Sequence, residues 1–256
     1  MSFNQNTNTY LKELKLSFNK SDLSFLNKLQ SAHVAKYSFN NLAVLLGENI
    51  KIDSESVFKK IVIEGRGGYC FEHNKLVYDT LQDLGYNVRL LLAKVVSNVE
   101  QEASRTHRIT LVNLNNEYYI VDAGFGPLGS IYPIKLALDK VQSQSFYHYR
   151  VQQSETKEYS FEIEKNGEFS TLYCFNLNTY TEADCTVSNF YSYQYPEAVF
   201  VNNLVVCNKL ENDIYSLRNG LFFHITKDNK TEVRITSPSL LQSLLLKHFT
   251  INLTID

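Results

Sequence analysis

The spacing of apolar residues changes once along the chain, near Tyr86, and this change constrains the fold more than any other feature. Before it, apolar residues recur at helical spacing in segments 10–16, 23–29, 53–63 and 70–84. After it, apolar and polar residues alternate, which is typical of half-buried strands. Because helices and strands occupy separate stretches, the sequence predicts an α+β fold rather than a doubly wound sheet.

Local signals place the ends of several elements. Asp22 is a favourable N-cap for the second helix, and Gly85 suits the position just past the fourth. Ser237 can cap a final helix over 238–248. Strands are expected over the following residues: 86–96, 105–114, 117–122, 171–175, 198–206 and 220–226.

Composition and charge exclude several classes of protein. The chain has 256 residues, a formal net charge of −2 and a pI of about 6.3, so it has no basic surplus to hold nucleic acid or an anionic membrane. We expect no signal peptide, because the N-terminal stretch lacks a basic segment followed by an apolar run. We expect no membrane span, because no run of about 18 apolar residues occurs. The four cysteines are far apart, which predicts no disulfide scaffold and no metal site and favours a reducing cytoplasm.

Cys70 lies where a helix is expected to begin, directly after the glycine-rich stretch 64–68. The first turn of a helix has free N–H groups and a partial positive charge, which stabilise a thiolate and lower the pKa of a cysteine. The same N–H groups can bind the oxyanion of a tetrahedral intermediate. The alternative is a buried, inert cysteine beside a tight turn.

His107 and Asp122 lie on two expected strands that flank a turn at Asn115-Asn116. If Leu114 pairs with Glu117, Ile109 faces Asp122 and His107 faces Gly124. His107 and Asp122 then become diagonal neighbours on one face of the sheet. A carboxylate beside an imidazole fixes its tautomer and supports its charged form. With Cys70 the set provides a nucleophile, a base and a group that orients the base.

Residues 66–74, with the sequence RGGYCFEHN, resemble the RGGxCxExN signature of the arylamine N-acetyltransferase family. Further stretches resemble the H-x4-PFENL, VDVGFG, N-x5-HP-x3-F and LL-x3-FGI-x-L motifs of that family: residues 33–42, 121–126, 189–200 and 244–253. The departures from these motifs are Ser38, Asn40, Gln194, Tyr195 and Thr250. None of these departures falls on one of the three candidate catalytic residues. The two directly before Pro196 leave open which amine the enzyme prefers.

The resemblance implies a helical bundle over 1–85 that carries the nucleophile, a β-barrel over 86–195 that carries histidine and aspartate, and an α/β lid over 196–256. It implies a papain-like Cys-His-Asp core. The implied reaction transfers acetyl from acetyl-CoA, a co-substrate rather than a tightly bound cofactor, to arylamines, arylhydroxylamines or hydrazines. No metal, nucleic acid or membrane partner is expected, and the oligomeric state stays open.

The resemblance also assigns roles to single residues. Cys70 takes the position of the acyl-carrying nucleophile, His107 that of the base and Asp122 that of the orienting carboxylate. The expected contacts with the acyl donor or the amine are Ser104, Phe125 and Gly126. Arg66 and Glu72 are expected to form a charge pair that supports the cysteine loop, and His73 is expected to point away from the nucleophile.

Three other functions are compatible with Cys70, His107 and Asp122. A cysteine protease or a transglutaminase-like enzyme employs the same kind of triad. An amide synthase that acts on a carrier-bound chain is a relative with the same triad. A binding module without catalysis would have an unreactive Cys70.

Overall fold

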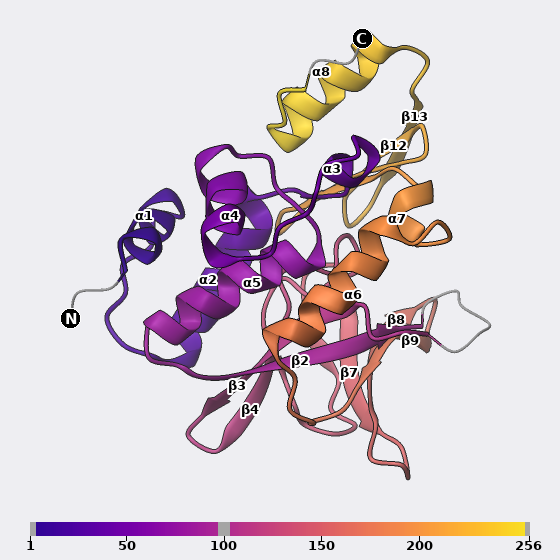
Figure 1. Ribbon diagram of the computed structural model, residues 1–256. Helices are drawn as coiled ribbons and strands as arrows, with labels where there is room; N and C mark the ends of the chain where they lie inside the picture. Colours follow the sequence, from indigo (N-terminus) through magenta and orange to yellow (C-terminus); the bar gives the residue numbers. More distant parts are fainter. Residues whose placement is uncertain (1–3, 97–102, 254–256) are drawn as a thin grey trace.

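The fold follows the order that the sequence predicts, with helices first and strands after them (Figure 1). The computed structural model describes residues 4–96 and 103–253. Its helices are α1 (Gln5–Glu13), α2 (Leu23–Lys36), α3 (Leu42–Leu45), α4 (Ser54–Phe58), the π-helix η1 (Lys59–Ile63), α5 (Cys70–Asp83), α6 (Glu182–Gln194), α7 (Val199–Asn202) and α8 (Pro238–Phe249). Its strands are β1 (Phe39–Asn40), β2 (Asn87–Val95), β3 (His107–Leu114), β4 (Glu117–Val121), β5 (Ile134–Lys135), β6 (Gln142–Ser143), β7 (His148–Gln153), β8 (Tyr159–Lys165), β9 (Glu168–Phe175), β10 (Val205–Lys209), β11 (Ile214–Arg218), β12 (Leu221–Ile225) and β13 (Lys230–Arg234).

Side-chain caps explain why the predicted helices begin where they do. Asp22 accepts a hydrogen bond from the N–H of Phe25 at 2.8 Å, and Ser237 accepts one from the N–H of Leu240 at 3.2 Å. Gly85 follows α5 with a φ of +80°, the left-handed conformation that ends many helices. The predicted starts of α2 and α8 and the predicted end of α5 are confirmed.

Eight antiparallel strands form a sheet that is nearly closed into a barrel, in the order β5-β4-β3-β2-β9-β8-β7-β6. The side chain of Gln142 on β6 connects the two outer strands: it donates to the carbonyl of Lys135 at 2.9 Å and accepts from its N–H at 2.8 Å. Inward-facing residues of the sheet form one apolar cluster that includes Tyr149, Phe161 and Tyr173. The barrel that the resemblance implies is confirmed.

A second antiparallel sheet has the order β1-β10-β11-β12-β13, and α8 packs on it (Figure 1). Its first strand comes from far upstream, since Phe39 pairs with Cys207 and Asn40 pairs with Val206. Leu245 and Phe249 of α8 are buried in the cluster between the helix and this sheet. The C-terminal sheet is therefore joined by backbone hydrogen bonds to the N-terminal region, and the division at 85 and 195 stays a prediction.

Three sequence-based assignments differ from the structure. The first helix ends at Glu13 rather than near Leu16, because the chain turns at Lys15 with a φ of +57°. The segment expected as a strand over 198–206 contains α7, and the strand β10 starts only at Val205. The helix α6 was not expected, although Thr181 caps it by accepting from the N–H of Asp184 at 3.4 Å.

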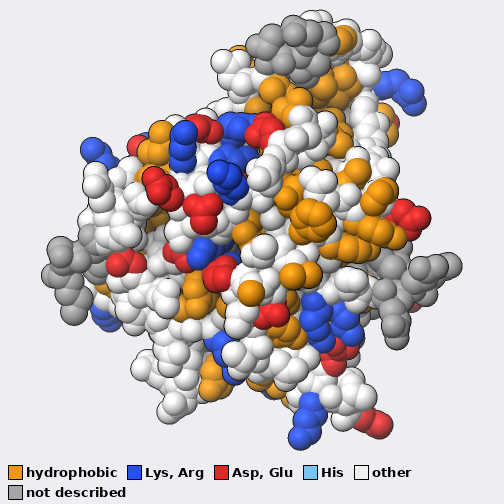
Figure 2. Space-filling model, viewed as in Figure 1, with side chains coloured by type: hydrophobic (Ala, Val, Ile, Leu, Met, Phe, Trp, Pro, Cys, Tyr) orange, Lys and Arg blue, Asp and Glu red, His pale blue; other side chains and the backbone are white. Residues whose placement is uncertain are grey.

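The outer face of α6 and α7 exposes apolar side chains, which lie among mixed charges on the face shown in Figure 2. Val187 is 72% exposed and Phe190 is 60% exposed. The buried face of α6 carries Cys185 together with the polar residues Asn189 and Ser192. The apolar residues therefore do not form one buried stripe at helical spacing, which explains why α6 was missed. Within residues 4–96 and 103–253, no helix is both long and apolar enough to cross a membrane.

Candidate active site

The glycine-rich loop before α5 brings Cys70 to the first position of that helix. Gly67 has a φ of +63°, and a Cβ there would lie 2.1 Å from the carbonyl oxygen of Ser38. A Cβ on Gly68 would lie 2.6 Å from Oε2 of Glu72. Both positions therefore exclude any side chain, and the loop can pack tightly beneath the nucleophile.

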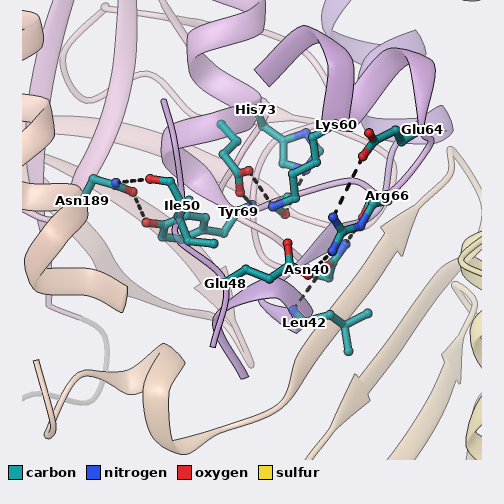
Figure 3. Close-up of polar contacts among 12 residues, drawn as sticks. Asn40, Leu42, Glu48, Ile50, Lys60, Glu64, Arg66, Tyr69, His73 and Asn189 are labelled. Carbon is teal, nitrogen blue, oxygen red and sulfur yellow. Dashed lines mark hydrogen bonds and ion pairs between the residues drawn. The ribbon is translucent and has the colours of Figure 1, made fainter. Parts of the chain in front are cut away.

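Two charge pairs, one buried and one partly exposed, support this loop (Figure 3). Glu72 is 1% exposed; it accepts from Nζ of Lys60 at 2.6 Å and from the N–H of Tyr69 at 3.1 Å. Arg66 pairs with Glu48 instead and lies 3.9 Å from Glu64. The predicted Arg66–Glu72 pair is wrong, because η1 delivers Lys60 to the buried carboxylate while Arg66 lies on the partly exposed side.

His73 is fully buried behind the loop and contacts other groups than Cys70. Its Nε2–H donates to the carbonyls of Gly68 at 3.1 Å and Ser38 at 3.2 Å, so its Nδ1 accepts from Nε2 of His33 at 2.7 Å. Nδ1 of His33 then accepts from the hydroxyl of Tyr10 at 2.5 Å. Burial lowers the pKa of His73 to about 4 and that of His33 well below its usual value. The prediction that His73 points away from the nucleophile is confirmed.

The hairpin β3–β4 brings His107 and Asp122 together as the turn geometry predicts. Leu114 pairs with Glu117, and both turn asparagines have the positive φ of a two-residue hairpin turn. Nε2 of His107 donates to Oδ2 of Asp122 at 2.7 Å, with the two side chains 2% and 3% exposed. This bond fixes the tautomer of the imidazole and leaves its Nδ1 as the second ring nitrogen.

Asn74 binds the carboxylate of Asp122 from the other side. Its Nδ2 donates to Oδ1 of Asp122 at 2.8 Å and to the carbonyl of Arg108 at 2.5 Å, and its Oδ1 accepts from the N–H of Ala123 at 2.8 Å. Burial opposes ionisation of Asp122, but the charge and hydrogen bond of His107, together with these amide donors, hold its pKa below the usual value.

Sequence reasoning gave no role to Asn74 or to Tyr173. Asn74 lies one helical turn after Cys70, and this i,i+4 spacing could have placed both on one face of α5. Tyr173 is fully buried on β9, with its ring centroid 5.2 Å from that of His107. Burial and the charge of Asp122 raise the pKa of Tyr173. No local pattern links β9 to the hairpin, so the sequence carries no signal for Tyr173.

The sulfur of Cys70 lies beside the backbone on both sides of His107. Sγ donates to the carbonyl of Thr106 at 3.7 Å, while the N–H groups of Phe71 and Arg108 favour the charged form of the sulfur. A Cβ on Gly124 would lie 2.8 Å from Cα of Cys70, so α5 also touches the segment that follows β4. The structure therefore brings the three predicted residues into one buried cluster.

Burial raises the pKa of the Cys70 thiol, and the nearby charge of Asp122 raises it further. The two N–H donors act in the opposite direction, as the position at the helix start predicts, but they do not outweigh burial. The prediction of a lowered thiol pKa is therefore wrong for the sulfur considered alone. A thiolate at this position requires a positive partner.

The three predicted substrate contacts lie in different environments. The ring of Phe125 stands edge-on to that of His107, with centroids 5.2 Å apart. Phe125 and Gly126 line a small cavity together with Asp122. Ser104 is exposed on the segment before β3, where its carbonyl accepts from the N–H of Thr106 at 3.0 Å.

A helical N-terminal region, a nearly closed barrel and a buried Cys-His-Asp cluster at their junction define a papain-like α+β enzyme. A sequence model of a family described as N-acetyltransferase matches residues 22–256. The arylamine N-acetyltransferase of Escherichia coli K12 is 35% identical over 215 residues, which cover 83% of this chain and 76% of the relative.

Two solved structures are similar over nearly the whole chain. The arylamine N-acetyltransferase from Salmonella typhimurium superposes with a TM-score of 0.93 at 28% identity, covering 99% of this chain and 94% of its own. The Mycobacterium marinum arylamine N-acetyltransferase in complex with CoA gives a TM-score of 0.91 at 26% identity, with 96% and 93% covered. This chain belongs to the arylamine N-acetyltransferase family, so the predicted fold class and enzyme class are confirmed.

Proposed function

We propose that this enzyme transfers acetyl from acetyl-CoA to arylamines, arylhydroxylamines or hydrazines through an acetyl thioester on Cys70. The observation that carries the proposal is the 2.7 Å bond between His107 and Asp122, with the sulfur of Cys70 beside the backbone of His107. A relative of the same fold has a structure with CoA, which supports the donor.

In the first half-reaction, the thiol proton of Cys70 passes to Nδ1 of His107. Because burial opposes a lone thiolate, the sulfur ionises together with the imidazole, whose positive charge Asp122 stabilises. The thiolate attacks the thioester carbonyl, and backbone N–H groups at the start of α5 stabilise the oxyanion. The C–S bond to CoA then breaks, and the departing sulfur takes the proton from His107.

In the second half-reaction, the amine nitrogen attacks the carbonyl of acetyl-Cys70. His107 accepts a proton from that nitrogen, the bond to Sγ breaks, and the returning thiolate completes the cycle. Free CoA leaves before the amine reacts, so the steady-state kinetics are ping-pong. Phe125 and Gly126 contact the amine or the acyl group, and Ser104 lies near the CoA thioester.

Residues 196–256 act as a lid that keeps water from the acetyl-cysteine.

The protein works in the cytoplasm. Its four cysteines are free, which fits a reducing compartment.

The test is to mix the protein with acetyl-CoA alone and to determine its intact mass, with Cys70→Ala as the matched control. The wild type should gain about 42 Da, one acetyl group, and the variant should not. A mass gain of equal size in both proteins, or in neither, would refute the acetyl-cysteine. Steady turnover of an arylamine with free acetyl-CoA would exclude an amide synthase that needs a carrier-bound chain, and hydrolysis of a peptide instead would favour the protease-like alternative.

A further inference from the structure

Arg108, the residue after His107 on β3, has a fully buried side chain. Neighbouring residues of a strand face opposite sides of the sheet, so Arg108 points away from Asp122 and toward the start of α6. Its two terminal nitrogens donate to the carboxylate of Glu182 at 2.7 Å and 2.9 Å, a bidentate pair. Its guanidinium also lies 5.1 Å from the ring centroid of Tyr78 on α5.

The main chain of Arg108 meets two groups of the active site. Its N–H favours the charged form of the Cys70 sulfur. Its carbonyl accepts from Nδ2 of Asn74 at 2.5 Å, and the same nitrogen donates to Asp122. Both effects require the two peptide groups that flank Cα of Arg108 to keep their positions relative to α5.

We propose that Arg108 is a positioning residue for acyl transfer: its guanidinium, held by Glu182, fixes the peptide groups that meet Cys70 and Asn74. This inference rests on the proposed function. Burial of a guanidinium is costly unless its charge is paired and hydrogen-bonded, so the bidentate pair allows one arrangement of the side chain. Held in that arrangement, Arg108 ties the strand of the base to α6, an element without any catalytic group of its own.

Lys75 provides a matched control, since it binds the same carboxylate. Its Nζ donates to Glu182 at 3.1 Å and to Asp79 at 2.9 Å, and its side chain is 10% exposed. Lys75→Met therefore removes a buried cation from Glu182 while the backbone contacts of Arg108 remain. If the ion cluster serves only stability, Lys75→Met and Arg108→Met should behave alike.

The experiment measures the alkylation rate of Cys70 by iodoacetamide against pH, which needs no acyl donor, and kcat/KM with acetyl-CoA and an arylamine. In Arg108→Met the N–H that favours the thiolate is displaced, so the midpoint of alkylation should shift to higher pH. A misplaced catalytic group should lower kcat/KM by about 10- to 100-fold. Arg108→Lys keeps a buried cation with one bond to Glu182, and it should fall between Arg108→Met and the wild type.

Lys75→Met should keep the wild-type midpoint. Thermal unfolding of each variant shows that the measured protein is folded, and Arg108→Lys supplies the result if Arg108→Met does not fold. A folded Arg108 variant with the wild-type midpoint and kcat/KM would overturn the proposal, and so would an equal shift in Lys75→Met. Because alkylation does not involve acetyl-CoA, failure of this proposal is distinct from failure of the acetyl-cysteine test.

Discussion

The two halves of the active site are held in place in different ways. The hairpin that carries His107 and Asp122 derives its geometry from a register and a turn within 104–126. The loop that carries Cys70 derives its geometry from distant segments. Two of its partners are Glu48, which pairs with Arg66, and Asn189, which binds Tyr69 (Figure 3). A third is His33, which binds His73. The hydrogen bonds between two neighbouring strands thus orient His107, whereas contacts with distant segments orient Cys70.

Asn74 connects the helix of the nucleophile to the hairpin of the base. It belongs to the helix of the nucleophile, yet its amide binds the carboxylate of Asp122 and the backbone at Arg108 and Ala123. Changes within the hairpin, at Asn74 and in the loop should therefore have distinct consequences.

The largest effect is expected within the hairpin, for Asp122→Asn. The amide keeps the shape of the side chain but no longer supports the imidazolium or fixes the tautomer of His107. We expect kcat/KM to fall about 10³- to 10⁴-fold while the thermal midpoint changes little. Steady-state assays and thermal unfolding check both parts, and retention of more than a tenth of the activity would show that Asp122 does not orient the base.

The next largest effect is expected for Asn74→Ala. The change removes a donor from Asp122 and leaves the N–H of Ala123 without its acceptor. We expect about 100-fold lower kcat/KM and a free energy of unfolding lower by about 2–3 kcal/mol. Denaturant titration and kinetics measure the two quantities. A folded variant with wild-type kcat/KM would mean that the hairpin orients Asp122 unaided.

A smaller effect, on stability, is expected in the loop for Gly67→Ala. The new Cβ meets the carbonyl of Ser38 in a left-handed backbone, which costs about 3 kcal/mol. Gly167→Ala is the control, because Gly167 also has positive φ but nothing within 4 Å. It should lose about 1 kcal/mol. Equal losses in the two variants would contradict the close packing of the loop.

The last comparison uses pH to separate the two halves of the site. The pKa of His73 is about 4 in the folded protein and about 6.5 in the unfolded chain. The unfolded chain therefore binds more protons between these values, so the free energy of unfolding falls as pH drops from about 6.5 to 4, by about 1.4 kcal/mol per pH unit for this histidine. The pKa of Asp122 is lowered, so its contribution is lost only as pH falls below about 3.9.

Replacing His73 with Asn should reduce the slope in the upper window and leave the lower one in place. Chemical denaturation at a series of pH values measures both windows. Equal slopes in the wild type and the variant between pH about 6.5 and 4 would show that buried His73 does not destabilise the protein in acid.

Sequence reasoning succeeded where the determinants are local. The hairpin register followed from the turn and the two-residue period, and the starts of α2 and α5 followed from Asp22 and the glycine loop. It failed where partners are far apart in sequence. The carboxylate of Glu72 binds Lys60 rather than Arg66. Helix α6 buries polar side chains while it exposes Val187 and Phe190, so its apolar residues give no helical stripe.

The sequence alone determined the α+β order of elements, the pairing of His107 with Asp122 and the resemblance to the family, because alternation, helix caps and turn residues act over a few neighbours. Tertiary structure decided the partner of each buried charge, the role of Asn74 and the raised pKa of Cys70. These depend on burial and on distances between remote segments, and electrostatic energy varies steeply with both.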